Sequence, residues 1–367
     1  MAFIISVIIA SIIIPRILII ATRKKLYDIP NARKVHTKAI PRLGGVSFYP
    51  TILFSFCGIF ALHFLLGYEI EHTWIEYLIP ECLLLACGIT LLYMTGIADD
   101  LVGVRYRQKF MIQFICATLF PLSGLWINNL YGFLGVYEIS YWIGIPFTIL
   151  TIIFITNAIN LIDGIDGLAS GLSIVALFIF GILFLILGLW VYSMLAFVTL
   201  GTLIPFFYYN VFGSAESDRK IFMGDTGSLT LGYILSFLAI KFSMYNPAIT
   251  LYIDGAIVIA FSTLIVPAFD VVRVVAIRLY NNKSPFEPDK NHIHHKLLAK
   301  GIGAKRAMIY LITIATLLCA MNIALVPYIN TTILILIDIL IWAGINFWWN
   351  GLKKSQPSLT DTVHTDS

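Results

Sequence analysis

Long apolar runs separated by short polar segments make up almost the whole chain. The runs are mostly about 17 to 25 residues long, which is the length that an α-helix needs to cross a bilayer. They fall at 2–22, 46–66, 77–97, 108–127, 141–159, 170–188, 190–211, 229–243, 248–275, 307–326 and 331–349. The pattern predicts an all-α polytopic integral membrane protein with about eleven transmembrane helices.

The composition agrees with a membrane-embedded chain. Of the 367 residues, 59% are hydrophobic and 12% are charged, whereas soluble domains contain roughly 45 to 50% apolar residues. We expect residues 1–350 to form a single transmembrane domain and residues 351–367 to form a disordered cytoplasmic tail. The first run is too long for a removable signal peptide and lacks its basic n-region, so it is expected to remain as a span.

The basic residues are distributed unevenly among the polar segments. All of the 24 Lys and Arg residues except Arg16 and Lys241 fall at 23–42, 105–109, 219–220, 273–306 and 353–354. Because short loops rich in Lys and Arg stay in the cytoplasm, the N-terminus is predicted outside and the C-terminus inside. The net charge of +4 then belongs to these loops rather than to a nucleic-acid-binding face. Lys241 is expected to snorkel to the outer surface.

The first polar segment on the predicted cytoplasmic face contains Arg42, followed by Gly44 and Gly45. Paired glycines permit a close backbone approach because they carry no side chain. A basic loop beside the membrane either contributes to a site or binds anionic lipid, and the loop alone leaves both open.

The next segment places Asp99 and Asp100 at the end of an apolar run, before Lys109. Adjacent carboxylates repel each other, so their charges need compensation. A metal ion, a bound cation or a shared proton would supply it at a functional site. The alternative is an ordinary solvated loop in which Arg105 and Arg107 neutralise the pair.

Asn157, Asn160, Asp163 and Asp166 are spaced by three in a segment otherwise made of small and apolar residues. In a helix this spacing forms one polar ridge. Amides and carboxylates are costly when they face lipid. The ridge therefore indicates either a functional site or a hydrogen-bond network between helices.

Asp225 stands between Gly224 and Gly227, directly before another apolar run. A phosphate is expected to bind the backbone amides of such a helix start. The Asp225 carboxylate is the kind of oxygen ligand that suits Mg²⁺. The alternative is an N-cap aspartate with a purely structural role.

His292, His294 and His295 form a cluster in a polar segment near the C-terminus. Histidines titrate near neutral pH and bind metals or phosphate oxygens. The five cysteines all lie in apolar runs without Cys-x-x-Cys spacing, so phosphate binding is favoured over zinc. Upstream, Asp270 and Arg273 lie three apart and are expected to pair. Three further acidic residues away from this face receive no role: Glu81, Asp254 and Asp338.

Five motifs in this order resemble the polyprenyl-phosphate N-acetylhexosamine-1-phosphate transferases, multi-span enzymes that start bacterial glycan synthesis on a lipid carrier. They are Pro-Arg-Leu-Gly-Gly at 41–45, Asp-Asp at 99–100, Asn-x-x-Asn-x-x-Asp-Gly-x-Asp-Gly at 157–167, Met-Gly-Asp-Thr-Gly-Ser at 223–228 and His-Ile-His-His at 292–295. The last motif looks like that of the branch that initiates O-antigen, common-antigen and wall teichoic acid polymers. Lys290-Asn291 departs from the Arg-rich pair that often precedes the first histidine there.

The resemblance implies that undecaprenyl phosphate attacks the β-phosphorus of a UDP-N-acetylhexosamine, with UDP-N-acetylglucosamine favoured, and that UMP leaves. It places the reaction on the cytoplasmic face of a bacterial inner membrane, among membrane lipids and without nucleic acid. A homodimer is compatible with it. The alternatives are a phospho-MurNAc-pentapeptide transferase and, in another class, a transporter that binds cations or relays protons.

The resemblance also implies roles for individual residues. Mg²⁺, or Mn²⁺ in its place, is expected on Asp225 with Asn160 and Asp163. Lys109 and the histidine segment would clamp phosphoryl oxygens, and Asp99 or Asp100 would orient the lipid phosphate or act as its base. Asp166 would support the nucleotide. The catalytic set is then Asp99, Asp100, Asp163, Asp166, His292, His294 and His295, and the substrate-binding set is Arg42, Gly44, Gly45, Lys109, Asn157 and Asn160.

Overall fold

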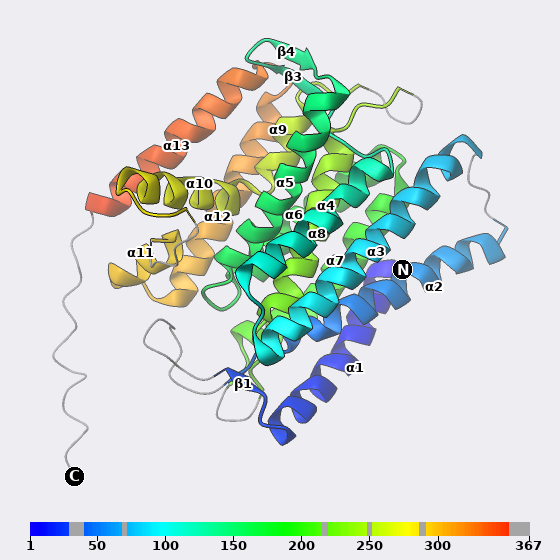
Figure 1. The fold of residues 1–367 in the computed structure, drawn as a ribbon, viewed down its shortest axis with the longest axis vertical. Coiled ribbons are helices and arrows are strands. Elements are labelled where there is room, and N and C mark those ends of the chain that lie inside the picture. Colours follow the sequence, from blue (N-terminus) through cyan, green and yellow to red (C-terminus); the bar gives the residue numbers. More distant parts are fainter. Residues whose placement is uncertain (29–39, 68–71, 215–218, 248–251, 286–290, 352–367) are drawn as a thin grey trace.

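The computed structural model describes residues 1–28, 40–67, 72–214, 219–247, 252–285 and 291–351 (Figure 1). Within these residues nine helices are long and apolar enough to cross a membrane, or up to ten if one bent pair counts as a span. The nine are α1 (Ala2–Arg23), α2 (Phe48–Leu65) with the preceding turn η1 (Gly44–Ser47), α3 (His72–Val102), α5 (Tyr141–Ile162), α6 (Leu168–Ile186), α7 (Trp190–Val211), α8 (Gly224–Ser243), α12 (Ala304–Leu325) and α13 (Thr331–Gly351). The prediction of an all-helical polytopic membrane protein is confirmed.

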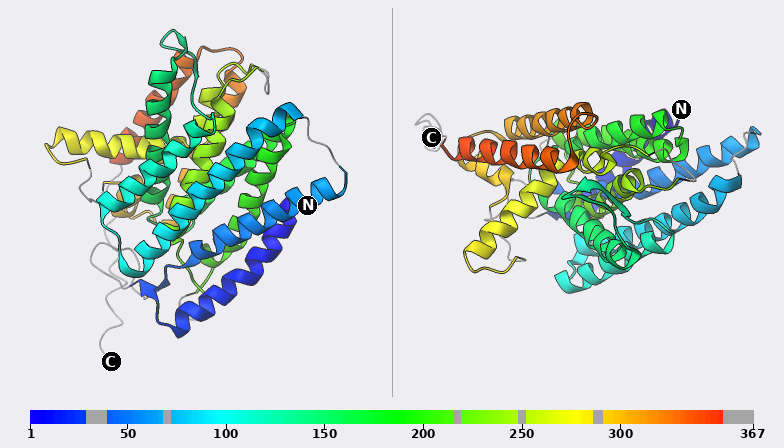
Figure 2. Two further views of the ribbon diagram at one scale, coloured as in Figure 1. Left: turned by 45° about the vertical axis from the view of Figure 1, so that its right-hand side comes forward. Right: turned by 90° about the horizontal axis from the view of Figure 1, so that it is seen from above.

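The number of spans is lower than the predicted eleven because two runs fold differently. The run at 108–127 forms α4 (Tyr106–Leu122), which at 17 residues is short for a span and carries charge in its first turn. The run at 248–275 breaks into α9 (Ala256–Ser262) and α10 (Ile265–Tyr280), which meet at an angle of 80°. Pro267 lies in the first turn of α10, where its missing N–H is no cost. Figure 2 shows α10, in yellow, running across the direction of the bundle.

The helix α8 lies at the centre of the bundle, and each of its 20 residues is buried. Its neighbours α3 and α5 approach closely because glycines stand at the contacts. A Cβ on Gly96 would lie 2.3 Å from the Thr226 Cα, and a Cβ on Gly88 would lie 2.1 Å from the Tyr233 hydroxyl. The first turn of α8 is therefore held firmly among its neighbours.

Two small antiparallel sheets and one short helix complete the described chain. The strands β1 (Tyr27–Asp28) and β2 (Ile40–Pro41) pair at one end of the molecule, and β3 (Asn129–Phe133) and β4 (Val136–Glu138) form a hairpin at the other (Figure 1). The helix α11 (Ile293–Ala299) carries the histidine motif. Of the predicted tail at 351–367, Gly351 is the last residue of α13, and 352–367 lie outside the described residues.

Lys241 does not reach the outer surface, so the prediction that it snorkels is wrong. Its Nζ lies 2.7 Å from Glu81 Oε1, and both residues are almost fully buried. The Tyr192 hydroxyl donates to the other Glu81 oxygen at 2.7 Å. Asp338 likewise has a buried partner, since Asn322 Nδ2 donates to it at 2.8 Å. Both acidic side chains link helices within the bundle.

Candidate functional site

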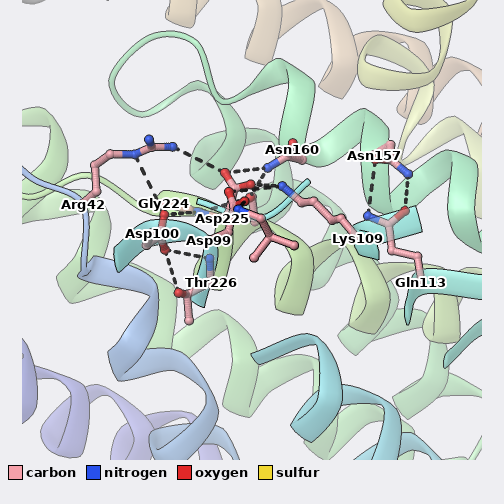
Figure 3. A network of polar contacts seen from close by, with 12 residues as sticks. Arg42, Asp99, Asp100, Lys109, Gln113, Asn157, Asn160, Gly224, Asp225 and Thr226 are labelled. Atoms are coloured by element: carbon pink, nitrogen blue, oxygen red, sulfur yellow. Dashed lines mark hydrogen bonds and ion pairs between the residues drawn. The ribbon is translucent and has the colours of Figure 1, made fainter. Parts of the chain in front are cut away.

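Polar side chains from four separate stretches of the chain meet at Asp225, in the first turn of α8 (Figure 3). Arg42 lies 3.4 Å from Asp225 Oδ1, and Asn160 Nδ2 donates to the same oxygen at 3.2 Å. The Lys109 ammonium bonds to Oδ2. The Asp225 carboxylate is thus largely buried and faced by two cations and an amide.

Asp100 caps the start of α8. The backbone N–H groups of Asp225 and Thr226 donate to its two oxygens at 2.9 Å, and the Thr226 hydroxyl donates at 2.7 Å. Its side chain is fully buried. Asp225 is therefore not the N-cap of α8, and the expectation that a phosphate binds these two amides is wrong because Asp100 already uses them.

The segment that carries Arg42 is attached to the same region through its glycines. The N–H groups of Gly44 and Gly45 donate to the carbonyls of 222–223 at 2.9 Å. A Cβ on Gly45 would lie 2.0 Å from the Gly227 nitrogen, so a side chain there would force the backbones apart. The close approach that these glycines permit is to α8, and it places Arg42 over Asp100 and Asp225 (Figure 3).

Asp99 keeps more solvent access than Asp100. Its Oδ1 accepts the Val104 N–H at 2.7 Å, and its Oδ2 lies 3.5 Å from Lys109 Nζ. Lys109 thus bridges Asp99 and Asp225. Backbone amides and Arg42 offset the charge of Asp100, and Lys109 offsets the charge of Asp99, so the repulsion between the two carboxylates is relieved. No described ion pair joins Arg105 to either carboxylate.

The polar ridge of α5 divides into two parts. Asn160 Nδ2 reaches Asp225 and also donates to Ser228 Oγ at 2.8 Å. Asn157 instead pairs with Gln113 through hydrogen bonds of 2.6 and 3.4 Å (Figure 3). The interpretation as a network between helices therefore fits Asn157, whereas Asn160 belongs to the Asp225 cluster.

Asp163 and Asp166 lie in the short connection between α5 and α6. No hydrogen bond or ion pair joins the Asp163 carboxylate to another residue within the described ranges. Burial raises the pKa of Asp163 to about 7, and the nearby Arg42 only partly offsets this. Asp166 forms an ion pair of 2.6 Å with Lys220. Sequence reasoning gave Lys220 no role, although it belongs to an isolated basic pair between two spans.

His292 and Asp270 form a contact that the sequence did not predict. His292 Nδ1 lies 2.8 Å from Asp270 Oδ2, while Arg273 lies 2.7 Å from Oδ1. The predicted Asp270–Arg273 pair is thus confirmed, but the carboxylate also links α10 to the start of α11.

The other two histidines lie beside each other, with ring centroids 4.3 Å apart. His294 packs against the Asp163–Asp166 connection, since a Cβ on Gly164 would lie 2.0 Å from His294 Nε2. Burial lowers the pKa of His294 to about 3, so its ring is neutral at physiological pH. The histidine segment is therefore adjacent to the acidic connection between α5 and α6.

The donor set suits a magnesium ion better than zinc. Throughout the part of the chain that the structure describes, no three His, Cys, Asp or Glu side chains converge to hold a metal by themselves. Mg²⁺ usually takes one or two protein carboxylates and completes its shell with water and substrate phosphate. Asp225, Asp163 and Asn160 offer such oxygens, and the Lys109 ammonium shows that the position between Asp225 and Asp99 attracts positive charge.

Comparison with known proteins identifies the family of the chain. The family model described as Glycosyl transferase family 4 matches residues 82–243. The chain is 35% identical over 319 residues to a "Probable undecaprenyl-phosphate N-acetylglucosaminyl 1-phosphate transferase" of Bacillus subtilis (strain 168), covering 85% of this chain and 81% of that protein.

Several relatives carry the name "Undecaprenyl-phosphate alpha-N-acetylglucosaminyl 1-phosphate transferase". The one from Yersinia pestis is 30% identical, with 82% of this chain and 77% of the relative covered. The one from Escherichia coli (strain K12) is 28% identical, with 83% and 77% covered. The family model spans Asp99, Asp100, Lys109, Asn160 and Asp225. Since a relative with 35% identity covers most of the chain, the chain belongs to glycosyl transferase family 4, as a multi-pass membrane enzyme of the polyprenyl-phosphate N-acetylhexosamine-1-phosphate transferase family.

Proposed function

We propose that the protein transfers N-acetylglucosamine-1-phosphate from UDP-N-acetylglucosamine to undecaprenyl phosphate and releases UMP. The observation that carries this proposal is the meeting of Arg42, Lys109, Asn160 and Asp99 around Asp225. Two anionic substrates must approach each other in this reaction, and a site with both carboxylates and cations can accept them together. The names of the relatives support the choice of sugar and lipid.

Asp225 is the proposed anchor of a magnesium ion, with Asp163 and Asn160 as further oxygen donors. When bound there, Mg²⁺ would neutralise the diphosphate of the sugar nucleotide and polarise the phosphorus. Asp163 suits this role because it is acidic, close to Arg42 and bonded to no other described side chain.

Lys109 and Arg42 are the proposed partners of the transferring phosphoryl group. In the structure Arg42 forms ion pairs with Asp100 and Asp225, and Lys109 forms ion pairs with Asp99 and Asp225. A bound metal ion would neutralise the negative charge of Asp225 in their place, and Lys109 and Arg42 could then bind phosphoryl oxygens. Charge spreads over those oxygens in the transition state, so positioning and electrostatics supply most of the catalysis.

Asp99, rather than Asp100, is the proposed residue for orienting the lipid phosphate. Asp100 accepts three hydrogen bonds from the start of α8, and its side chain has no exposed surface. Asp99 retains some exposure beside Lys109. A phosphomonoester is already largely ionised near pH 7, so we assign Asp99 an orienting role before that of a base.

The site is proposed to face the cytoplasm, with the N-terminus outside and the C-terminus inside, in a bacterial inner membrane. The Lys and Arg distribution supports this orientation, and nucleotide sugars are made in the cytoplasm. The functional residues gather at one end of the bundle, whereas a transporter needs its binding groups near the midplane.

The test is to incubate the purified protein with undecaprenyl phosphate, Mg²⁺ and a panel of UDP-sugars, and to measure UMP and the mass of the lipid product. UMP together with a polyprenyl-diphosphate-N-acetylglucosamine, dependent on both the lipid and Mg²⁺, is the expected result. A product only with UDP-muramoyl-pentapeptide would overturn the choice of sugar. Uptake by vesicles without release of UMP would overturn the reaction itself.

A further inference from the structure

Asp270 is a fully buried carboxylate that gathers donors from two separate segments. Its Oδ1 accepts from the Ile293 N–H at 2.9 Å and from Arg273 at 2.7 Å, and its Oδ2 bonds His292 Nδ1 at 2.8 Å. The same Arg273 donates to the Asn291 carbonyl at 2.5 Å. Asp270 therefore holds the start of α11 on α10 across a long connection.

The short helix α11 depends on this contact for its first turn. The residue at its N-cap position is His292, which makes no side-chain cap hydrogen bond. Asp270 supplies the missing acceptor by accepting the Ile293 N–H. The same carboxylate therefore sets both the place of α11 and the direction of the His292 ring.

The contact also selects which nitrogen of His292 is available to a ligand. Because a carboxylate only accepts, the Nδ1 atom of His292 must carry a proton toward Asp270. The charge of Asp270 is already balanced by Arg273, so a neutral His292 ring leaves no buried charge without a partner. In a neutral ring the other nitrogen, Nε2, has a free lone pair.

The Nε2 atom of His292 keeps a small contact with solvent, although the residue is only 6% exposed. This atom forms no hydrogen bond to another group within the described ranges. By contrast, His294 Nδ1 is both unbonded and fully shielded from solvent. His292 lies parallel to His294, which packs on the connection that holds Asp163 and Asp166. His292 thus lies close to the connection between α5 and α6 that carries Asp163 and Asp166.

We propose that Asp270 is a positioning residue that holds His292 in the Nδ1-protonated form, so that His292 Nε2 accepts a hydrogen bond from a hydroxyl or amide N–H of the sugar nucleotide. The inference rests on the proposed function and assigns His292 to recognition of the donor substrate. A lone pair on Nε2 repels phosphate oxygens, which are also acceptors. His292 therefore distinguishes the donor groups of the nucleotide sugar and does not clamp its phosphates.

The variant Asp270→Asn tests the proposal with little change of shape. Its amide oxygen still accepts from Arg273 and Ile293, but its NH₂ group faces His292 Nδ1. The ring must then move its proton to Nε2 and lose the free acceptor. We expect the KM for UDP-N-acetylglucosamine to rise about tenfold, as for one lost hydrogen bond, with the KM for undecaprenyl phosphate almost unchanged. The melting temperature is expected to fall, because Arg273 loses the charge of its partner.

A double-mutant cycle shows whether Asp270 acts through His292. In a His292→Ala background, Asp270→Asn is expected to change the KM for the sugar nucleotide less than about twofold. The exposed Asp254 provides the matched control, Asp254→Asn, which should leave both KM values unchanged. An equal loss from Asp270→Asn in both backgrounds, or an unchanged KM in His292→Ala, would overturn the proposal.

A measurement without turnover separates this inference from the proposed function. In protein labelled with ¹⁵N-histidine, the NMR signals of His292, assigned by comparison with His292→Ala, should show a protonated Nδ1 in the wild type and a protonated Nε2 in Asp270→Asn. A protonated Nε2 in the neutral wild-type ring overturns the inference. Absence of UMP release from any UDP-sugar, with the expected NMR result, instead overturns the proposed function and the assignment of His292 to the sugar nucleotide, and leaves the positioning of His292 by Asp270 intact.

Discussion

The Glu81 carboxylate and the Lys241 ammonium form a buried ion pair of 2.7 Å between α3 and α8. The same two helices are joined at their other ends, where Asp100 accepts from the first turn of α8. Lys241 lies roughly 24 Å along α8 from Asp225, at about 1.5 Å per residue. The register that brings Asp99 and Asp100 to Asp225 is therefore held at both ends of the helix pair.

Replacing Glu81 by Ala is expected to lower the free energy of unfolding by roughly 3–5 kcal/mol, because Lys241 is left as a buried charge without a partner. Thermal unfolding of the purified protein in detergent measures the change. The pair Glu81→Leu with Lys241→Met removes both charges and should recover most of the loss. Glu76→Ala on the exposed side of α3 is the control. Wild-type stability of Glu81→Ala would show that the ion pair does not hold these helices.

Asp225→Asn is expected to reduce kcat at least about a hundredfold, roughly 2.7 kcal/mol of barrier. The substitution keeps the shape of the side chain and removes the charge that Arg42, Lys109 and the proposed metal ion share. The rate of UMP release at millimolar Mg²⁺ gives the result, with Asp254→Asn as the control. Near-normal turnover would remove Asp225 from the metal site.

Asp99 and Asp100 are expected to respond differently to the same change. Asp100→Asn places an NH₂ group against donors of α8 and should lower the free energy of unfolding by about 1–3 kcal/mol. Asp99→Asn should keep the melting temperature and lower kcat, because its proposed role is to orient the lipid phosphate. The melting temperature and kcat should be measured for both variants. The opposite pattern would assign the structural role to Asp99 and the orienting role to Asp100.

The elevated pKa of Asp163, about 7 against an ordinary 3.8, predicts that Mg²⁺ and protons compete for this carboxylate. The apparent affinity for Mg²⁺, taken from UMP release, should rise with pH up to about 7 and then level off. Asp163→Asn should abolish this slope. A wild-type affinity that does not change with pH below 7 would mean that Asp163 is not a ligand.

The raised pKa of Asp163 also makes the free energy of unfolding depend on pH. The folded protein favours protonated Asp163. The contribution of this residue to the free energy of unfolding is therefore fully present below about pH 4 and is lost as the pH rises through about 7. The difference in melting temperature between the wild type and Asp163→Asn should change over this range and remain constant above it. A constant difference across the range would argue against the shift.

His294→Ala is expected to reduce kcat at least about tenfold, roughly 1.4 kcal/mol of barrier. The ring packs on Gly164 and helps to place the connection that carries Asp163 and Asp166. Because burial keeps the His294 ring neutral, the pH dependence between 5 and 9 should not change. An unchanged rate would show that the connection keeps its place without the ring.

The sequence predicted the helical membrane fold and most of the Asp225 cluster, because both depend on local patterns. Run length indicates spans, and the spacing of Asn160 and Asp225 within apolar surroundings indicates buried polar contacts. The break between α9 and α10 was missed because the apolar run continues through it. Its physical signal was Pro267, which can also lie within a straight span.

Contacts between distant segments could not be predicted, since nothing local specifies a partner. The sequence suggested Asp225 as the residue that caps the start of α8, but Asp100 from another helix has that role. It likewise paired Asp270 with Arg273, three residues away, and gave no sign of His292. Lys241 was assigned to the surface because its partner Glu81 lies far away along the chain.

The complete burial of α8 has a consequence for the biogenesis of the protein. Among the nine candidate spans α8 has the lowest mean hydropathy, so it gains least from entering lipid alone. Its polar residues are satisfied only once α3 and α5, which are synthesised earlier, already stand around it. Insertion of α8 is thus coupled to assembly, and changes along its contacts with α3 should reduce the amount of protein in the membrane before they slow its turnover.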